Sequence, residues 1–387
     1  MIDQKINFSL LSILFISLFS FSSCDDLEET SSLPNQSLLN NNLVVHSIDD
    51  EISYFNNSFG YNTGGWTASK NPRMSADVNG DGKADLIGFG DAGVYVSLSN
   101  GTSSTYRENW VNWTPPTFTV NGGWEVSKHP RAVADVNGDG KADLIGFGNE
   151  GVFVALSTGS EFTYREAWYT SSQNTFCVEG GWDVSKHPRE VADVNGDGKA
   201  DIIGFGNDEV VVALSTGTGF SYRQPWYTSS QSTFCFNGGW EVSKHPRTIA
   251  DVNGDGKADI VGFGNDEVFV ALSTGTGFSY RQPWYTSSQS TFCFNGSWEV
   301  SKHPRTVADV NGDGNADIVG FGNEGVFVAY SNGSSFQYRQ LWSNNFGYND
   351  GWDVILQPRV TADVNGDGKS DIIGFDLDGV YVTFSNL

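Results

Sequence analysis

Six short acidic segments of this 387-residue chain carry the residue types that bind a hard metal ion. The first runs from Asp77 to Asp85 as Asp-Val-Asn-Gly-Asp-Gly-Lys-Ala-Asp, and successive copies follow at intervals of 58, 58, 58, 58 and 54 residues. In each copy, Asp, Asn, Asp and Asp occupy positions 1, 3, 5 and 9, and position 7 needs only its backbone carbonyl. An all-oxygen set of this kind favours Ca²⁺ over a soft transition metal. The sequence therefore predicts about six calcium ions, one in each repeat.

The predicted ligand positions are the same in all six loops. They are Asp77, Asn79, Asp81, Lys83, Asp85, Asp135, Asn137, Asp139, Lys141, Asp143, Asp193, Asn195, Asp197, Lys199, Asp201, Asp251, Asn253, Asp255, Lys257, Asp259, Asp309, Asn311, Asp313, Asn315, Asp317, Asp363, Asn365, Asp367, Lys369 and Asp371. Position 12 is a glycine such as Gly88 and not a bidentate Glu, so these loops are not EF-hands. The simplest interpretation is a structural metal that stabilises the turn between two strands.

The metal loops also account for much of the charge of the chain, which is −24. Three Asp in each of six loops supply 18 of the 46 acidic residues. No basic face remains to neutralise phosphates, so a nucleic-acid partner is not expected.

A repeat of this length predicts a β-propeller, an all-β ring of similar blades. One unit shows four candidate strands, bounded by turn residues. They are Thr248–Val252, Asp259–Gly264, Glu267–Ser273 and Phe278–Trp284, with Pro283 marking an edge strand. Four short antiparallel strands in about 58 residues are typical of one propeller blade.

The two ends of the repeat region indicate how the ring closes. The last repeat stops after its third strand, Val380–Ser385, while Glu51–Phe55 precedes the first repeat without a blade of its own. We therefore expect the N-terminal strand to complete the final blade, which gives six blades. Seven blades are the alternative, if Leu33–Asp50 contributes more than a tether.

The first 50 residues have a different character from the repeats. An apolar run from Ile6 to Phe21 is followed by Ser22-Ser23-Cys24, which predicts a signal peptide over residues 1–23. The segment resembles a bacterial lipoprotein signal, which implies lipidation of Cys24 and a membrane contact through that lipid alone. A plain signal peptide is the alternative. Residues 24–50 then form an acidic and polar tether, and the propeller occupies residues 51–387. The expected location is the bacterial cell surface, or the secreted fraction if no lipid is attached.

The repeated unit resembles a known family. Asp-x-Asn-x-Asp-Gly-x-x-Asp followed by Gly-Phe-Gly is similar to the FG-GAP/VCBS repeat of integrin α-type propellers. With Gly-Trp and Lys-His-Pro-Arg added, the unit looks most like the Psathyrella velutina lectin type. That resemblance implies calcium and binding of N-acetylglucosamine or sialylated glycans between blades. The lectin type has seven blades, whereas six are counted here.

A second repeated cluster could hold such a ligand. A flat aromatic face beside a few fixed polar groups suits a small polar molecule such as a sugar. The candidate residues are Trp66, Trp124, His129, Arg131, Trp182, His187, Arg189, Trp240, His245, Arg247, Trp298, His303, Arg305 and Trp352. Asn71 and Gln357 replace His in the first and last copies, where hydrogen bonding is kept but a proton shuttle would be lost. The alternative is structural, with Trp in the core and Arg bracing neighbouring blades.

Two further repeated features receive structural interpretations. The Tyr-Arg pairs are placed on fourth strands, at the outer rim; their arginines are Arg107, Arg165, Arg223, Arg281 and Arg339. Cys177, Cys235 and Cys293 occupy one repeat position and are too far apart for disulfides, so they are expected to be small buried residues.

Three functions can be compared at this point. A multivalent carbohydrate-binding module follows from six near-equal clusters on a rigid ring. A surface adhesion scaffold that binds proteins or glycoproteins, without sugar binding, is the alternative. An enzyme is not expected, because no asymmetric catalytic constellation stands out from the repeats.

Overall fold

The computed structural model describes residues 52–114, 117–170, 176–227, 234–286 and 292–387. The predicted signal peptide, Cys24 and the tether lie outside these residues. Within the described chain, no helix has the length and apolar character needed to cross a membrane.

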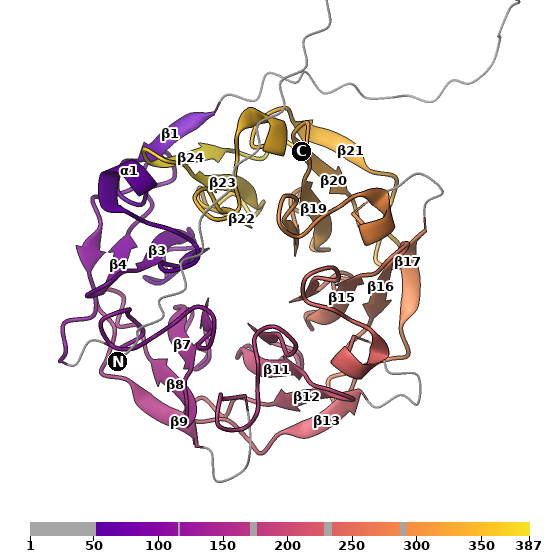
Figure 1. Cartoon of the computed structure of the whole chain (residues 1–387), viewed down its shortest axis with the longest axis horizontal. Coiled ribbons are helices and arrows are strands. Elements are labelled where there is room, and N and C mark those ends of the chain that lie inside the picture. The colour runs from indigo at the N-terminus through magenta and orange to yellow at the C-terminus, as the bar shows by residue number, and fades with distance from the viewer. Residues whose placement is uncertain (1–51, 115–116, 171–175, 228–233, 287–291) are drawn as a thin grey trace, which may run out of the picture. The chain divides into compact units, whose positions relative to one another are not determined.

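Six four-stranded antiparallel sheets follow one another around a ring (Figure 1). Five sheets use four consecutive strands each. Their bounds are β2 Arg73–Ala76, β3 Asp85–Phe89, β4 Val94–Ser97 and β5 Glu108–Asn109; β6 Arg131–Ala134, β7 Asp143–Phe147, β8 Gly151–Ala155 and β9 Glu166–Thr170; β10 Arg189–Ala192, β11 Asp201–Phe205, β12 Val210–Ala213 and β13 Gln224–Tyr227; β14 Arg247–Ala250, β15 Asp259–Phe263, β16 Glu267–Ala271 and β17 Gln282–Thr286; β18 Arg305–Ala308, β19 Asp317–Phe321, β20 Val326–Ala329 and β21 Gln340–Ser343. Short helices α1 Tyr61–Gly64, η2 Phe236–Gly238, η3 Phe294–Gly296 and η4 Tyr348–Asp350 lie in the connections between blades.

The sixth sheet joins the two ends of the propeller. It contains β22 Arg359–Ala362, β23 Asp371–Phe375, β24 Val380–Thr383 and, at its outer edge, β1 Ser53–Asn56. The innermost strands contact each other in sequence around the ring, and β2 contacts β22 to close it. The predicted six-bladed propeller, closed by an N-terminal strand, is confirmed.

Each hydrophobic core lies between two neighbouring blades. Ile145 and Phe147 of the second blade pack in one cluster with Ile202 and Val211 of the third. The second strand of every blade is buried along its whole length, as in Asp143–Phe147. This burial explains why the first residue of the Gly-Phe-Gly motif is a glycine. A Cβ on Gly146 would lie only 2.5 Å from the Trp124 ring, so a side chain there would force the two apart.

Several strand boundaries differ from the predictions. β14 and β16 each end two residues earlier than expected, and β1 begins at Ser53; Glu51 lies outside the described residues. The fourth strand, predicted as Phe278–Trp284, is β17 at Gln282–Thr286, because Phe278 only forms an isolated bridge with Ser273. Pro283 does lie on an edge strand, as expected, next to a register shift in the pairing with β16.

Candidate functional site

The acidic loops connect the first and second strands of each blade. In the first loop, Asp77 Oδ1 accepts the Gly80 N–H at 2.6 Å and Oδ2 accepts the Gly82 N–H at 2.7 Å. Both glycines have positive φ, 79° and 82°, which few other residues adopt without strain. The glycines therefore allow the loop to fold back around its first carboxylate.

The loops also tie the blades together. The Ala142 N–H of the second loop donates to the Asp77 carbonyl of the first at 2.7 Å, and the Ser157 hydroxyl donates to the Val78 carbonyl at 2.5 Å. The backbone bond recurs at all six junctions, including Ala84 N–H to the Asp363 carbonyl at 2.7 Å. A disturbance of one loop is thus transmitted to a neighbouring blade.

The chemistry of the loop oxygens fits a calcium ion. Among the described residues, however, no group of three His, Cys, Asp or Glu side chains converges as a metal cluster. Asp85 is fully buried and accepts the Val78 and Ser99 N–H groups at 3.1 and 2.8 Å. Burial raises the pKa of Asp85 to about 7, although these hydrogen bonds oppose the shift. A carboxylate has about four lone-pair sites, so the observed bonds leave acceptor capacity for a cation. Calcium stays a prediction.

The repeated Trp and His residues lie at the opposite end of the blades from the acidic loops. β10 runs toward the loop Asp193–Asp201 and β11 runs back from it to Gly206, beside the predicted Trp/His cluster. A metal in the loops would therefore support the fold without touching a ligand at this cluster.

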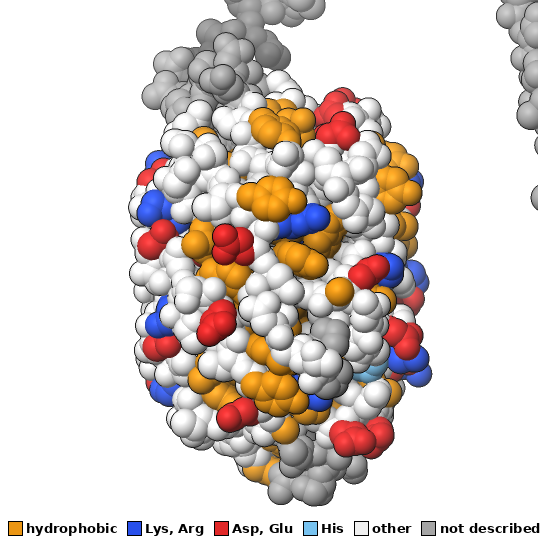
Figure 2. Space-filling model, turned by 90° about the vertical axis from the view of Figure 1, so that its left-hand side faces the viewer, with side chains coloured by type: hydrophobic (Ala, Val, Ile, Leu, Met, Phe, Trp, Pro, Cys, Tyr) orange, Lys and Arg blue, Asp and Glu red, His pale blue; other side chains and the backbone are white. Residues whose placement is uncertain are grey.

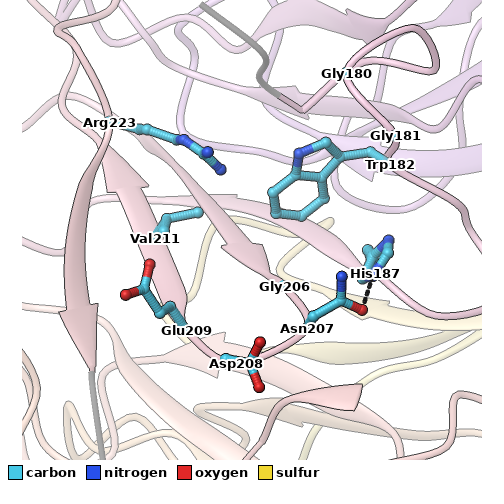
Figure 3. A pocket seen from close by; sticks show the side chains of 10 residues that line it. All are labelled: Gly180, Gly181, Trp182, His187, Gly206, Asn207, Asp208, Glu209, Val211 and Arg223. Atoms are coloured by element: carbon cyan, nitrogen blue, oxygen red, sulfur yellow. Dashed lines mark hydrogen bonds between the residues drawn. The ribbon is translucent and has the colours of Figure 1, made fainter. Parts of the chain in front are cut away.

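A cavity of about 380 Å³ marks this cluster in the third blade. Trp182, His187, Asn207, Glu209 and Arg223 contribute to its walls (Figure 3). Corresponding cavities of about 260 and 200 Å³ lie in the fourth and first blades. The third-blade cavity is larger than these two and is lined by Val211, where the fourth and first blades place the aromatic rings of Phe269 and Tyr95.

The His residues are held as neutral hydrogen-bonding groups. His187 Nδ1 accepts the Asp183 N–H at 3.2 Å, so the proton lies on Nε2, which donates to Asn207 Oδ1 at 2.9 Å. Burial lowers the pKa of His303, which also favours the neutral ring. His129, His245 and His303 make the same pair of contacts.

The substitutions in the last and first blades preserve part of this arrangement. Gln357 Oε1 accepts the Asp353 N–H at 3.1 Å, and its Nε2 donates to Asp376 Oδ1 at 2.6 Å. Asn71 donates to Asp91 Oδ1 at 3.1 Å. All six blades therefore place a hydrogen-bonded amide or imidazole at this position.

The tryptophans belong to both core and pocket. All six are between 4% and 8% exposed, and each packs against a buried Phe, as Trp240 does against Phe234 at 5.0 Å between ring centroids. Trp66, Trp182 and Trp240 also contribute to the walls of the three cavities. Trp124, Trp298 and Trp352 occupy the same repeat position in the remaining blades.

The arginines of the Lys-His-Pro-Arg motif are buried between the blades. Arg131 is 6% exposed, donates to the Phe118 carbonyl at 3.0 Å, and lies 5.6 Å from the Phe89 ring of the preceding blade. Burial lowers the pKa of Arg131 to about 10, which leaves it charged near neutral pH. Arg189, Arg247 and Arg305 make the equivalent contacts. None of these four arginines lines the three cavities described above.

The arginines of the Tyr-Arg pairs contribute to the pocket, contrary to the interpretation from sequence. Arg107, Arg223 and Arg281 line the three cavities and are half-buried. They precede the fourth strands, because β13 begins only at Gln224. Neighbouring residues of an extended chain point to opposite sides. This alternation could have identified the pocket arginines from the sequence, because it places each Arg on the opposite side of the chain from its exposed Tyr.

The tyrosines do lie at the surface. Tyr106 is 70% exposed and Tyr222 is 56% exposed. Figure 2 shows the rim of the ring, where hydrophobic side chains lie among interspersed acidic and basic ones.

The sixth blade differs from the other five at the pocket arginine. Ser53 pairs with Val382 as Gln224 pairs with Val212, so Ile52 takes the place of Arg223. The substitution arises because β1 comes from the N-terminal end of the propeller and not from a repeat.

The three cysteines are free and buried, as predicted. Burial raises the pKa of Cys235 and of Cys293 to about 12, so neither is a reactive thiolate.

Comparison with known proteins adds a family to this geometry. A model of the FG-GAP-like repeat matches residues 77–146. A solved Agrocybe aegerita lectin, described for specific recognition of non-reducing terminal N-acetylglucosamine, is 36% identical, with a TM-score of 0.65 and coverage of 85% of this chain and 84% of the lectin. The Photorhabdus luminescens Tc holotoxin pore is similar in fold alone, at 14% identity, TM-score 0.51, and coverage of 86% of this chain and 15% of that one. Comparison with curated proteins gives no match.

The fold and the repeated loops define an FG-GAP-like repeat β-propeller. Within that class, the chain belongs to the family of the Agrocybe aegerita lectin. Because this relative is a lectin, the prediction that the chain is not an enzyme is confirmed.

Proposed function

We propose that the chain is a multivalent lectin whose pockets bind glycans ending in N-acetylglucosamine. The observation that supports this most is the repeated pocket, which combines a Trp ring, a hydrogen-bonded His and a half-buried Arg. A sugar offers an apolar face for the aromatic ring and hydroxyl or amide groups for the polar residues. The 36% identical lectin recognises the same terminal sugar. Sialylated glycans are a second ligand to test on the same surface.

Removal of the pocket arginine is expected to weaken binding without unfolding the ring. Arg223→Ala together with Arg281→Ala should abolish two pockets, because each guanidinium supplies hydrogen-bond donors to the cavity. On a dense N-acetylglucosamine surface, apparent affinity should fall by about tenfold or more, since several sites act together there. Glycan-array binding measures the loss, and an unchanged melting temperature shows that the fold survives. Wild-type avidity in the double variant would contradict the proposed site.

Calcium in the six loops is proposed as a structural component. Asp77, Asn79, Asp81, Asp85 and the Lys83 carbonyl would hold it in the first repeat. Bound calcium would supply positive charge among three carboxylates at each junction between blades.

We also propose a lipid anchor at Cys24. The acyl chain would tether the ring to a membrane and leave its pockets free to bind several glycans. Cys24→Ala should shift the protein from the membrane fraction to the soluble fraction and abolish labelling with palmitate. Equal labelling of wild type and variant would rule out this anchor.

A further inference from the structure

One position on the pocket wall divides the six blades into two groups. It lies at the start of the third strand or directly before it. The third and fourth blades carry Glu209 and Glu267 there, whereas the other blades carry Gly93, Gly151, Gly325 and Gly379. The rest of each repeat is similar, so this difference changes the charge of two pockets.

The two glutamates face the cavities. Glu209 lines the third-blade cavity, with Val211 lying between its carboxylate and Arg223 (Figure 3). Glu267 lines the fourth-blade cavity together with Trp240 and Arg281. Within the described part of the chain, no hydrogen bond or ion pair engages either carboxylate. Both are therefore available to a ligand.

The neighbouring charges do not cancel this difference. An acidic residue precedes the variable position in the second blade as well, at Glu150. In the third blade the corresponding Asp208 accepts a hydrogen bond from the Asn237 amide at 2.9 Å. A pocket arginine is common to both blades. The glutamate thus adds one negative charge that the second-blade pocket lacks.

We infer that the third and fourth pockets prefer sugars that carry a free ammonium group, such as 2-amino-2-deoxyhexoses without the acetyl group. This inference rests on the proposed function, because it assigns a ligand subclass to two of the same pockets. An ammonium group offers three donors and a positive charge to the carboxylate. Compared with the pockets that carry Gly at this position, the added carboxylate makes these two pockets less favourable for an anionic sugar through like-charge repulsion.

The test compares methyl β-glucosaminide with methyl N-acetyl-β-glucosaminide by titration calorimetry at low salt. In the double variant Glu209→Gly and Glu267→Gly, which copies the other four blades, affinity for the amine sugar should fall about fivefold, as for an exposed ion pair. Affinity for the acetylated sugar should fall by a smaller factor than affinity for the amine sugar, because the acetylated ligand carries no charge for the carboxylate.

A gain-of-function variant makes the test symmetrical. Gly151 begins β8 and pairs with Thr170, as Glu267 begins β16 and pairs with Thr286, and Gly151 is not among the glycines with positive φ. Gly151→Glu should therefore add a third site for the amine sugar.

Three results would overturn the inference. One is a double variant that weakens both sugars equally, and another is a Gly151→Glu protein with no added amine-sugar site. The third is that the wild type binds the acetylated sugar, while the double variant binds the amine sugar as tightly as the wild type does. These results leave the lectin function intact. Failure of wild type to bind either sugar would overturn the lectin function and this inference together.

Discussion

Removing calcium is expected to lower the melting temperature of the ring by about 10 °C or more. Each loop gathers three Asp residues, and Asp85 and its equivalents are fully buried. A ligand present at 100 times its dissociation constant stabilises the native state by about 2.7 kcal/mol per site. Six sites would give about 16 kcal/mol if the ring unfolds as one unit. The hydrogen bonds from loop to loop support such cooperative unfolding.

The measurement is differential scanning calorimetry after exhaustive chelation, followed by addition of Ca²⁺ or of Mg²⁺. Ca²⁺ should restore the transition, whereas Mg²⁺ should have little effect because it demands near-ideal octahedral geometry. A single-loop control, Asp139→Ala, should lose about one sixth of the calcium-dependent stabilisation. A melting curve that chelation leaves unchanged would exclude a structural metal.

Trp240→Ala is expected to destabilise the propeller by about 3–5 kcal/mol, the range for loss of a large buried aromatic side chain. Trp240 is 5% exposed, lies 5.0 Å from the Phe234 ring, and would be only 2.6 Å from a Cβ on Gly262. Its removal leaves a cavity between two blades, so this variant cannot report on ligand binding alone. Denaturant unfolding monitored by circular dichroism measures the loss.

His245 provides the matched control for this variant. His245→Gln should cost less than about 1 kcal/mol, because Gln357 already makes both equivalent hydrogen bonds in the sixth blade. His245→Ala should cost about 1–3 kcal/mol, since it leaves the Glu241 N–H and Asn265 without their partner. An unfolding midpoint of Trp240→Ala equal to that of wild type would place the indole outside the core.

The sequence predicted the propeller because its periodicity determines both the length of a blade and the way in which the ring closes. The spacing of the Asp loops set the blade length, and the incomplete last repeat indicated closure by an N-terminal strand. β1 and β24 pair as this prediction requires. The fourth strands were predicted less well, because they lie at the outer edge, where Pro283 and a register shift interrupt the pairing.

The candidate site was predicted only in part. The Trp of each repeat and the His of four repeats were identified from their residue types. Arg223 was missed because it stands beside an exposed Tyr, and which of two neighbours points inward depends on the orientation of the strand. Ile52 could not be aligned with Arg223 from spacing alone, since β1 does not belong to a repeat. Both assignments needed the register of the outermost strands.

The most direct test of the proposed lectin is titration calorimetry with N-acetylglucosamine, which counts working pockets. Five blades carry the pocket arginine, and Ile52 replaces it in the sixth. We expect about five sites on the wild-type ring, and about three after Arg223→Ala and Arg281→Ala. No heat of binding by the folded wild-type protein, or a site number that the double variant leaves unchanged, would contradict the proposal.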